Sequence, residues 1–162
     1  MRPWFAILLS VFAFTASPAA AEDVRFLASF KPPLLIHTPK GWTSQKLDTL
    51  LSENLQIASD DQTIIFTISL APTLGSVDKI AAKLLRQKAL SKAPAKFAGL
   101  DALVFRGTTT NPDGLKLNLK LIVAPIDPQE AYTCMLITAM DDSDKRLAPA
   151  SALIAGVKLL PK

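Results

Sequence analysis

The chain has 162 residues, of which 49% are hydrophobic, and its 18 basic and 14 acidic residues give a formal charge of +4. It contains one cysteine and one histidine. This composition excludes disulfide-rich mini-proteins, haem attachment through paired cysteines, zinc sites built from cysteines, and intrinsic disorder.

The first 21 residues have the pattern of a secretory signal peptide. Arg2 supplies a positive charge, an apolar run extends from Trp4 to Phe14, and the small residues Ala19 and Ala21 suit signal peptidase. The apolar run is shorter than the roughly 20 residues that a helix needs to cross a bilayer. We therefore expect cleavage after Ala21, a periplasmic or secreted location, and no stable membrane anchor after cleavage. The alternative is a buried N-terminal helix or a short anchor.

Residues 22–162 then form the mature chain, and we expect them to fold as a single domain. A chain of this length buries roughly two thirds of its unfolded surface. Its lysines are scattered, without a basic run or interleaved aromatic residues. The sequence therefore gives no indication of nucleic-acid binding.

The first half of the mature chain has the pattern of short strands separated by turns. The segment Pro39-Lys40-Gly41 reads as a turn that leads into a strand at Trp42, and Asp60-Asp61-Gln62 reads as a solvated hairpin turn. In the strand after this second turn, apolar side chains alternate with polar ones and share one face. The strands are expected at residues 24–30, 34–38, 42–46, 55–59 and 63–70.

A helix is expected to begin after Gly75. Ser76 is a suitable N-cap, Asp78 lies in the positive first turn, and Pro94 is expected to end the helix. The helix carries one apolar stripe and should lie against a sheet. The stripe consists of Val77, Ile80, Ala81, Leu84 and Leu85.

Three longer strands follow, at residues 100–108, 115–123 and 130–139. A turn at residues 111–114 and another at 125–129 separate them. In the middle strand the odd-numbered residues are apolar, whereas Lys116, Asn118 and Lys120 face the other way. This alternation predicts an antiparallel strand with one face in water.

The chain should close with a helix from about Pro149 to Val157, after a turn or short helix. We therefore predict an α+β fold with a central antiparallel sheet of about five to seven strands flanked by two main helices.

Two short motifs have a functional and a structural interpretation. Ser76 and Lys79 spell the S-x-x-K pattern of serine acyltransferases, but the companion motifs are absent, which favours a plain N-cap. The acidic residues Asp141, Asp142 and Asp144 could be read as calcium ligands. They lack the alternate spacing, glycine and distal glutamate of a calcium loop, and acids ahead of a helix stabilise its N-terminus.

Three single residues complete the set of candidates. Cys134 lies in an apolar strand and is expected to be a buried free thiol. His37 is the only imidazole, and one histidine cannot build a multi-histidine metal site. Trp42 should pack at an edge of the core, and a ligand groove near Trp42 and His37 is the functional alternative. The sequence indicates no catalytic residues, no metal site and no cofactor.

The order of elements, the Pro39-Lys40-Gly41-Trp42 start and the piece Ala98-Gly99-Leu100-Asp101-Ala102 resemble the PsbP-like superfamily. That superfamily includes DcrB-like envelope proteins and Mog-type Ran-binding proteins. The resemblance covers about residues 34–160, and Pro32-Pro33 and Pro149 depart from the usual pattern. It implies a central antiparallel sheet with flanking helices, and a non-catalytic binding or assembly role. Fold-level similarity does not determine the function.

The sequence leaves two functional hypotheses. The first is a non-enzymatic exported protein that binds an envelope protein, or helps to assemble one, through an edge or groove of its sheet. A narrower form of it is a periplasmic immunity or inhibitor protein. The other is a carrier of a small molecule or lipid, or a cryptic hydrolase, with a pocket near Trp42 and His37.

Overall fold

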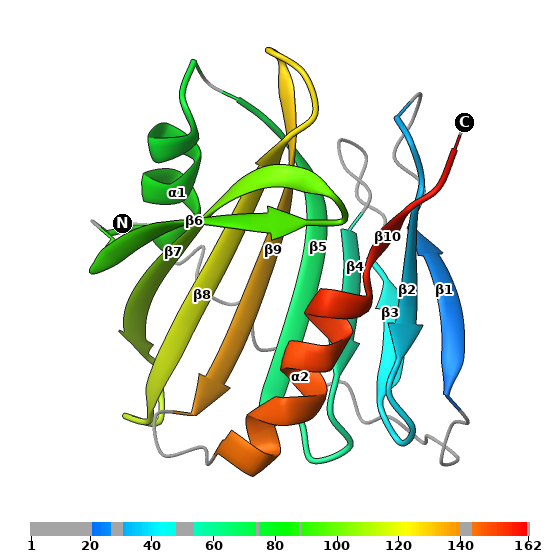
Figure 1. Cartoon of the computed structure of the whole chain (residues 1–162). Coiled ribbons are helices and arrows are strands. Elements are labelled where there is room, and N and C mark those ends of the chain that lie inside the picture. The colour runs from blue at the N-terminus through cyan, green and yellow to red at the C-terminus, as the bar shows by residue number, and fades with distance from the viewer. Residues whose placement is uncertain are drawn as a thin grey trace.

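The computed structural model describes residues 21–26, 31–47, 54–73, 75–87, 89–139 and 144–161 (Figure 1). The predicted signal peptide occupies residues 1–21, so all of it except Ala21 lies outside the described residues. Within the described residues, no helix is long and apolar enough to cross a bilayer.

The core of the fold is an antiparallel sheet of seven strands, and a second sheet has three strands. The order in the large sheet is β3-β4-β5-β9-β8-β7-β6, and in the small sheet β1-β2-β10. The prediction of an α+β fold with an antiparallel sheet and two helices is therefore confirmed. The strands are β1 (Glu22–Phe26), β2 (Leu34–Thr38), β3 (Thr43–Lys46), β4 (Asn54–Ala58), β5 (Ile64–Pro72), β6 (Ser91–Phe97), β7 (Leu100–Thr110), β8 (Lys116–Pro125), β9 (Glu130–Ala139) and β10 (Lys158–Leu159), and the helices are α1 (Val77–Leu85) and α2 (Asp144–Gly156).

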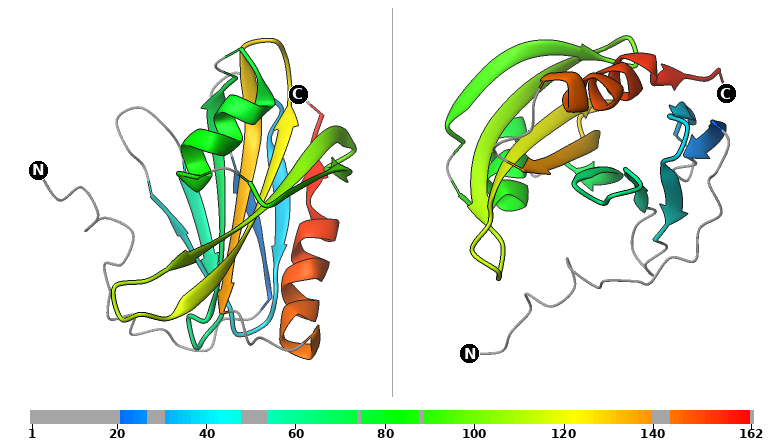
Figure 2. Two further views of the ribbon diagram at one scale, coloured as in Figure 1. Left: turned by 90° about the vertical axis from the view of Figure 1, so that its left-hand side faces the viewer. Right: turned by 90° about the horizontal axis from the view of Figure 1, so that it is seen from below.

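The two helices lie on opposite faces of the large sheet. Helix α1 buries Ile80, Ala81 and Leu85 against β7, β8 and β9. Helix α2 packs on the other face, where Ala150 and Leu153 join a core that also includes the small sheet. Figure 2 shows the large sheet curving around α2 and the small sheet. The central strands of the sheet are therefore covered on both faces.

Apolar side chains at alternate positions of the strands form most of the core, as predicted. On β5, Ile64, Phe66 and Ile68 are buried on the face toward α2. On β8, Leu121 is buried beneath α1, but Ile122 on the opposite face is buried too. The prediction that β8 keeps one face in water is therefore wrong for its second half. The reason is that the curved sheet brings α2 and the small sheet over the face opposite α1.

Helix α1 ends earlier than predicted. Ser76 caps its start, as expected, by accepting a hydrogen bond from the backbone N–H of Lys79 at 3.3 Å. Arg86 then adopts a left-handed conformation with φ of 54°, which stops the helix. Pro94, predicted to end the helix, instead lies inside the edge strand β6.

Strands β6 and β7 form a hairpin with a two-residue turn. Ala98 and Gly99 both have positive φ, 52° and 84°, as a type I′ turn requires. The two residues that flank such a turn, Phe97 and Leu100, form backbone hydrogen bonds with each other. Hydrogen-bonded pairs alternate along an antiparallel ladder, so the odd-numbered residues of β6 form backbone hydrogen bonds to β7. Pro94 therefore occupies a position whose N–H would point away from the sheet, so it costs no ladder hydrogen bond.

Helix α2 starts at Asp144, so the predicted start at Pro149 is wrong. Pro149 lies in the helix interior, where it removes one backbone hydrogen bond. The helix tolerates this because Leu147, Ala150, Leu153 and Val157 recur at helical spacing and pack on the core.

Candidate functional site

A shallow hollow lies beside Trp42, the residue proposed from the sequence for a ligand groove. Gly41, with φ of 85°, turns the chain so that the Trp42 N–H bonds to the Pro39 carbonyl at 3.1 Å. The indole belongs to the core and is only 7% exposed. The hollow has a volume of about 160 Å³, which is below the roughly 300 Å³ of the smallest typical ligand sites. Its lining is Trp42, Ser59, Asp60, Asp61, Thr63, Ile64 and Pro149.

The polar wall of this hollow is the hairpin turn between β4 and β5. The Ser59 hydroxyl donates to the Asp61 carboxylate at 2.7 Å, and the same carboxylate oxygen accepts the Thr63 hydroxyl at 2.8 Å. The Asp60 carboxylate accepts the backbone N–H of Asp61 at 2.9 Å. These bonds confirm the predicted turn at Asp60 and Asp61. Both carboxylates already serve the turn, and both residues are exposed.

His37 lies on β2 and does not line the hollow. Its Nδ1 is 2.8 Å from the Asp23 carboxylate, directly opposite it on β1. The two side chains are 66% and 61% exposed. Trp42 is buried in the core whereas His37 is on the surface, so the structure does not bring the two residues together in one site.

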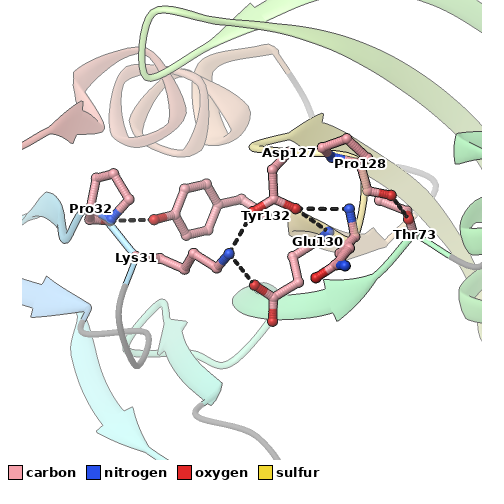
Figure 3. Close-up of polar contacts among 8 residues, drawn as sticks. Lys31, Pro32, Thr73, Asp127, Pro128, Glu130 and Tyr132 are labelled. Carbon is pink, nitrogen blue, oxygen red and sulfur yellow. Dashed lines mark hydrogen bonds and ion pairs between the residues drawn. The ribbon is translucent and has the colours of Figure 1, made fainter.

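The most extensive polar cluster was not found from the sequence. Lys31 Nζ lies 2.5 Å from the carboxylates of both Asp127 and Glu130, and the Tyr132 hydroxyl donates to the Pro32 carbonyl (Figure 3). No local pattern could indicate this cluster, because Lys31 and Asp127 are 96 positions apart. We refer to the side chains of Lys31, Asp127, Glu130 and Tyr132 as the lysine clip.

The lysine clip joins the segment before β2 to the turn between β8 and β9. Hydrogen bonding to Asp127 and then to Glu130 raises the pKa of Lys31. Hydrogen bonds from Lys31 and from the Gln129 backbone lower the pKa of Asp127. Burial raises the pKa of the Tyr132 phenol. Each charged group has a partner within the cluster, so the clip acts as a connection between the two sheets.

The remaining candidates that lie among the described residues have structural roles. Cys134 is a buried free thiol, as predicted, and burial raises its pKa well above the ordinary value, so it stays protonated. The S-x-x-K serine is an N-cap. Asp141 and Asp142 lie outside the described residues, and Asp144 is described only as the first residue of α2. The described residues contain no group of three or more histidine, cysteine and acidic side chains placed to hold a metal ion.

Two solved structures share the fold. The first is a protein of Bacteroides thetaiotaomicron VPI-5482, with a TM-score of 0.55 and 18% identity; the match covers 80% of this chain and 46% of that one. The second is LpqN, described as involved in cell envelope biogenesis of Mycobacterium tuberculosis, with a TM-score of 0.56 and 13% identity. That match covers 88% of this chain and 93% of LpqN. At these identities, the similarity establishes the fold alone.

No family model and no curated protein matches the chain. The resemblance to the PsbP-like superfamily therefore stays a prediction. This chain spans about half the length of the Bacteroides protein and nearly the whole length of LpqN.

Proposed function

We propose that the protein is a non-enzymatic, exported envelope protein that acts by binding another protein of the cell envelope. The observation that carries the proposal is the similarity of its fold to LpqN over almost the full length of both chains. The signal-peptide pattern of residues 1–21 supports the same location.

The outer edge of β1 is the surface that best suits such a partner. β1 is the terminal strand of the small sheet and pairs with β2 along five residues (Figure 1). An edge strand presents unpaired N–H and C=O groups, to which an extended segment of another protein can add a strand. By contrast, β6, which is an edge strand of the large sheet, is protected by Pro94 and by the exposed Lys92 and Lys96.

Site-specific crosslinking tests the proposal in the living cell. A photoreactive amino acid replaces Arg25, which is exposed on β1, and in a control chain it replaces Lys83, which is exposed on α1. We expect one discrete adduct with an envelope protein from position 25 and none from position 83. Mass spectrometry identifies the partner, and reciprocal purification verifies it. The proposal fails if neither position gives an adduct, or if both give the same adducts. An adduct with a toxin would identify the immunity or inhibitor form of this function.

The hollow at Trp42 supports a second candidate, a carrier of a small molecule or lipid or a cryptic hydrolase. Trp42, Ile64 and Pro149 give it an apolar wall, and Asp60 adds a polar group. Native mass spectrometry of the purified protein tests this candidate. A co-purifying ligand that is lost in Trp42→Phe and retained in His37→Ala would support it. A ligand-free mass for the wild-type protein, together with no hydrolysis of ester substrates, would reject it.

A further inference from the structure

Two cationic side chains lie directly opposite each other on the large sheet. Arg106 on β7 is the register partner of Lys120 on β8, and Lys120 is in turn the partner of Leu136 on β9. Leu136 belongs to the core on the α2 side, so all three side chains share that face. Like charges at directly opposed positions destabilise a sheet.

No described acidic group compensates this pair. Neither the Arg106 nor the Lys120 side chain forms an ion pair or hydrogen bond within the described residues, where the ion pairs involve Lys31, His37, Lys92 and Lys96. The adjoining register positions on the same face hold uncharged side chains. These are Ser91, Thr108, Asn118 and Leu136.

The partial burial of Lys120 adds to the free-energy cost of placing these two cations side by side. Lys120 is half-buried, whereas Arg106 is exposed. Burial lowers the pKa of Lys120, and the charge of Arg106 lowers it further. The strands thus hold a partly desolvated ammonium next to a guanidinium, with an amide and a hydroxyl beside them. An arrangement that is unfavourable for the unliganded sheet becomes favourable when an anion is bound.

We propose that Arg106 and Lys120 form a binding site for a phosphate group on the α2 side of the sheet. The guanidinium can donate two parallel N–H groups to phosphate oxygens, and the ammonium adds a second positive charge. Thr108 and Asn118 are neighbouring hydrogen-bond donors on the same face. A doubly charged group with several acceptor oxygens matches two adjacent cations better than a single carboxylate. Figure 1 shows α2 in front of β5, and β9, β8 and β7 follow in that order to its left.

Inorganic phosphate is the first probe, and thermal unfolding is the readout. At phosphate about ten times the dissociation constant, we expect the wild-type Tm to exceed that in chloride of equal ionic strength by about 3 °C or more. We expect Lys120→Met and Arg106→Gln to abolish this difference. Lys116→Met is the matched control, because Lys116 lies on the same face of β8 but opposite the uncharged Thr110. We expect this variant to keep the phosphate-dependent difference in Tm. The proposal is overturned if the wild-type protein shows no phosphate-specific shift, or if Lys120→Met keeps it.

The unliganded variants separate this proposal from a purely structural role. If Lys120 is an uncompensated cation, Lys120→Met should unfold in chloride at the same or a higher temperature than the wild-type protein. A marked drop in the Tm would mean that the ammonium already has a partner in the fold, which contradicts the proposal. Calorimetric titration with phosphate should give a dissociation constant at least tenfold weaker for each variant than for the wild-type protein.

Vesicles identify the source of the phosphate. Co-sedimentation is measured with phosphatidylglycerol vesicles and with phosphatidylcholine vesicles. Binding to phosphatidylglycerol that Lys120→Met abolishes and Lys116→Met retains would assign a lipid headgroup. A phosphate-specific Tm shift without vesicle binding would assign a soluble phosphate compound. Vesicle binding that both variants weaken equally would reflect net charge and would reject the lipid source. These outcomes do not depend on the crosslinking at β1, so the two proposals fail or succeed separately.

Discussion

The phenolic hydroxyl of Tyr132 on β9 donates a hydrogen bond to the backbone carbonyl of Pro32, which lies 100 positions earlier in the chain. The ring is fully buried and stands edge-on to Phe26 of β1, with ring centroids 6.4 Å apart. One side chain therefore joins the large sheet to the start of the small sheet through both an apolar and a polar contact.

Tyr132→Phe keeps the buried ring but removes the hydroxyl. The Pro32 carbonyl then loses its described partner, and we expect the free energy of unfolding to fall by about 1–2 kcal/mol. Urea denaturation followed by circular dichroism measures the change. A variant as stable as the wild-type protein would show that the bond contributes nothing to the attachment of the two sheets.

Because Tyr132 is the only tyrosine in the chain, its ionisation can be followed directly. Burial raises its pKa above 10.0, so the absorbance change near 295 nm should come at higher pH in the folded protein than in urea. A phenol with a raised folded-state pKa contributes stability that is lost as the pH rises from 10.0 through the folded value. A titration that coincides with the urea-unfolded curve would contradict the buried position.

Asp127→Asn tests the charge of the lysine clip. The amide oxygen can still accept the backbone N–H groups of Gln129 and Glu130, but it no longer pairs as an anion with Lys31. The pKa of Asp127 is lowered, so its stabilisation is complete above 3.8 and is lost as the pH falls through the folded value. We expect the variant to be less stable than the wild-type protein at pH 7. The difference between their free energies of unfolding should become smaller below pH 3.8.

Unfolding measured from pH 7 to about pH 2.5 checks this expectation. Asp101→Asn is the matched control, because the Asp101–Lys96 pair is 94% and 69% exposed and should contribute less. If the loss of stability in Asp127→Asn is the same at every pH, the charge of Asp127 is not the cause of that loss.

The thiol of Cys134 should be unreactive in the folded protein. It is 1% exposed in the core, and burial raises its pKa, so little thiolate is present at neutral pH. A thiol reagent should label it only as fast as the protein unfolds, and labelling should accelerate with urea. Rapid stoichiometric labelling under native conditions would contradict the buried environment.

Pro94→Thr should increase self-association with little change in stability. The substitution adds an N–H at an outward-facing position of the edge strand β6, where it can pair with another chain. We expect dimers or larger species in size-exclusion chromatography with light scattering, and a free energy of unfolding within about 0.5 kcal/mol of the wild-type value. A variant that stays monomeric at high concentration would show that Lys92 and Lys96 suffice to protect this edge.

Strong periodicity was the reliable guide from sequence to fold. The apolar alternation of β5 and β8 identified both strands, and the stripe that includes Ile80 and Leu85 identified the buried face of α1. These signals are local, since a side chain's position in its own strand or helix decides which face it occupies.

The errors came from tertiary context. Alanine at positive φ is uncommon, so the turn at Ala98 carries no recognisable hairpin signal, and the sequence pattern predicts helix for the part of β6 up to Pro94. Pro149 suggested a helix start, but the packing of α2 on the core outweighed the lost hydrogen bond. The lysine clip and the opposition of Arg106 and Lys120 depend on strand order, which the sequence pattern did not specify.

The placement of β2 has a consequence for biogenesis. Its two neighbours lie far apart along the chain, since β1 begins at Glu22 and β10 begins at Lys158. During synthesis β2 is made more than a hundred residues before its second neighbour, so the small sheet forms completely only after Leu159 is available. Such high contact order slows folding. Until β10 has been made, β2 lacks one of its two hydrogen-bonded neighbours, so the small sheet is incomplete on that side.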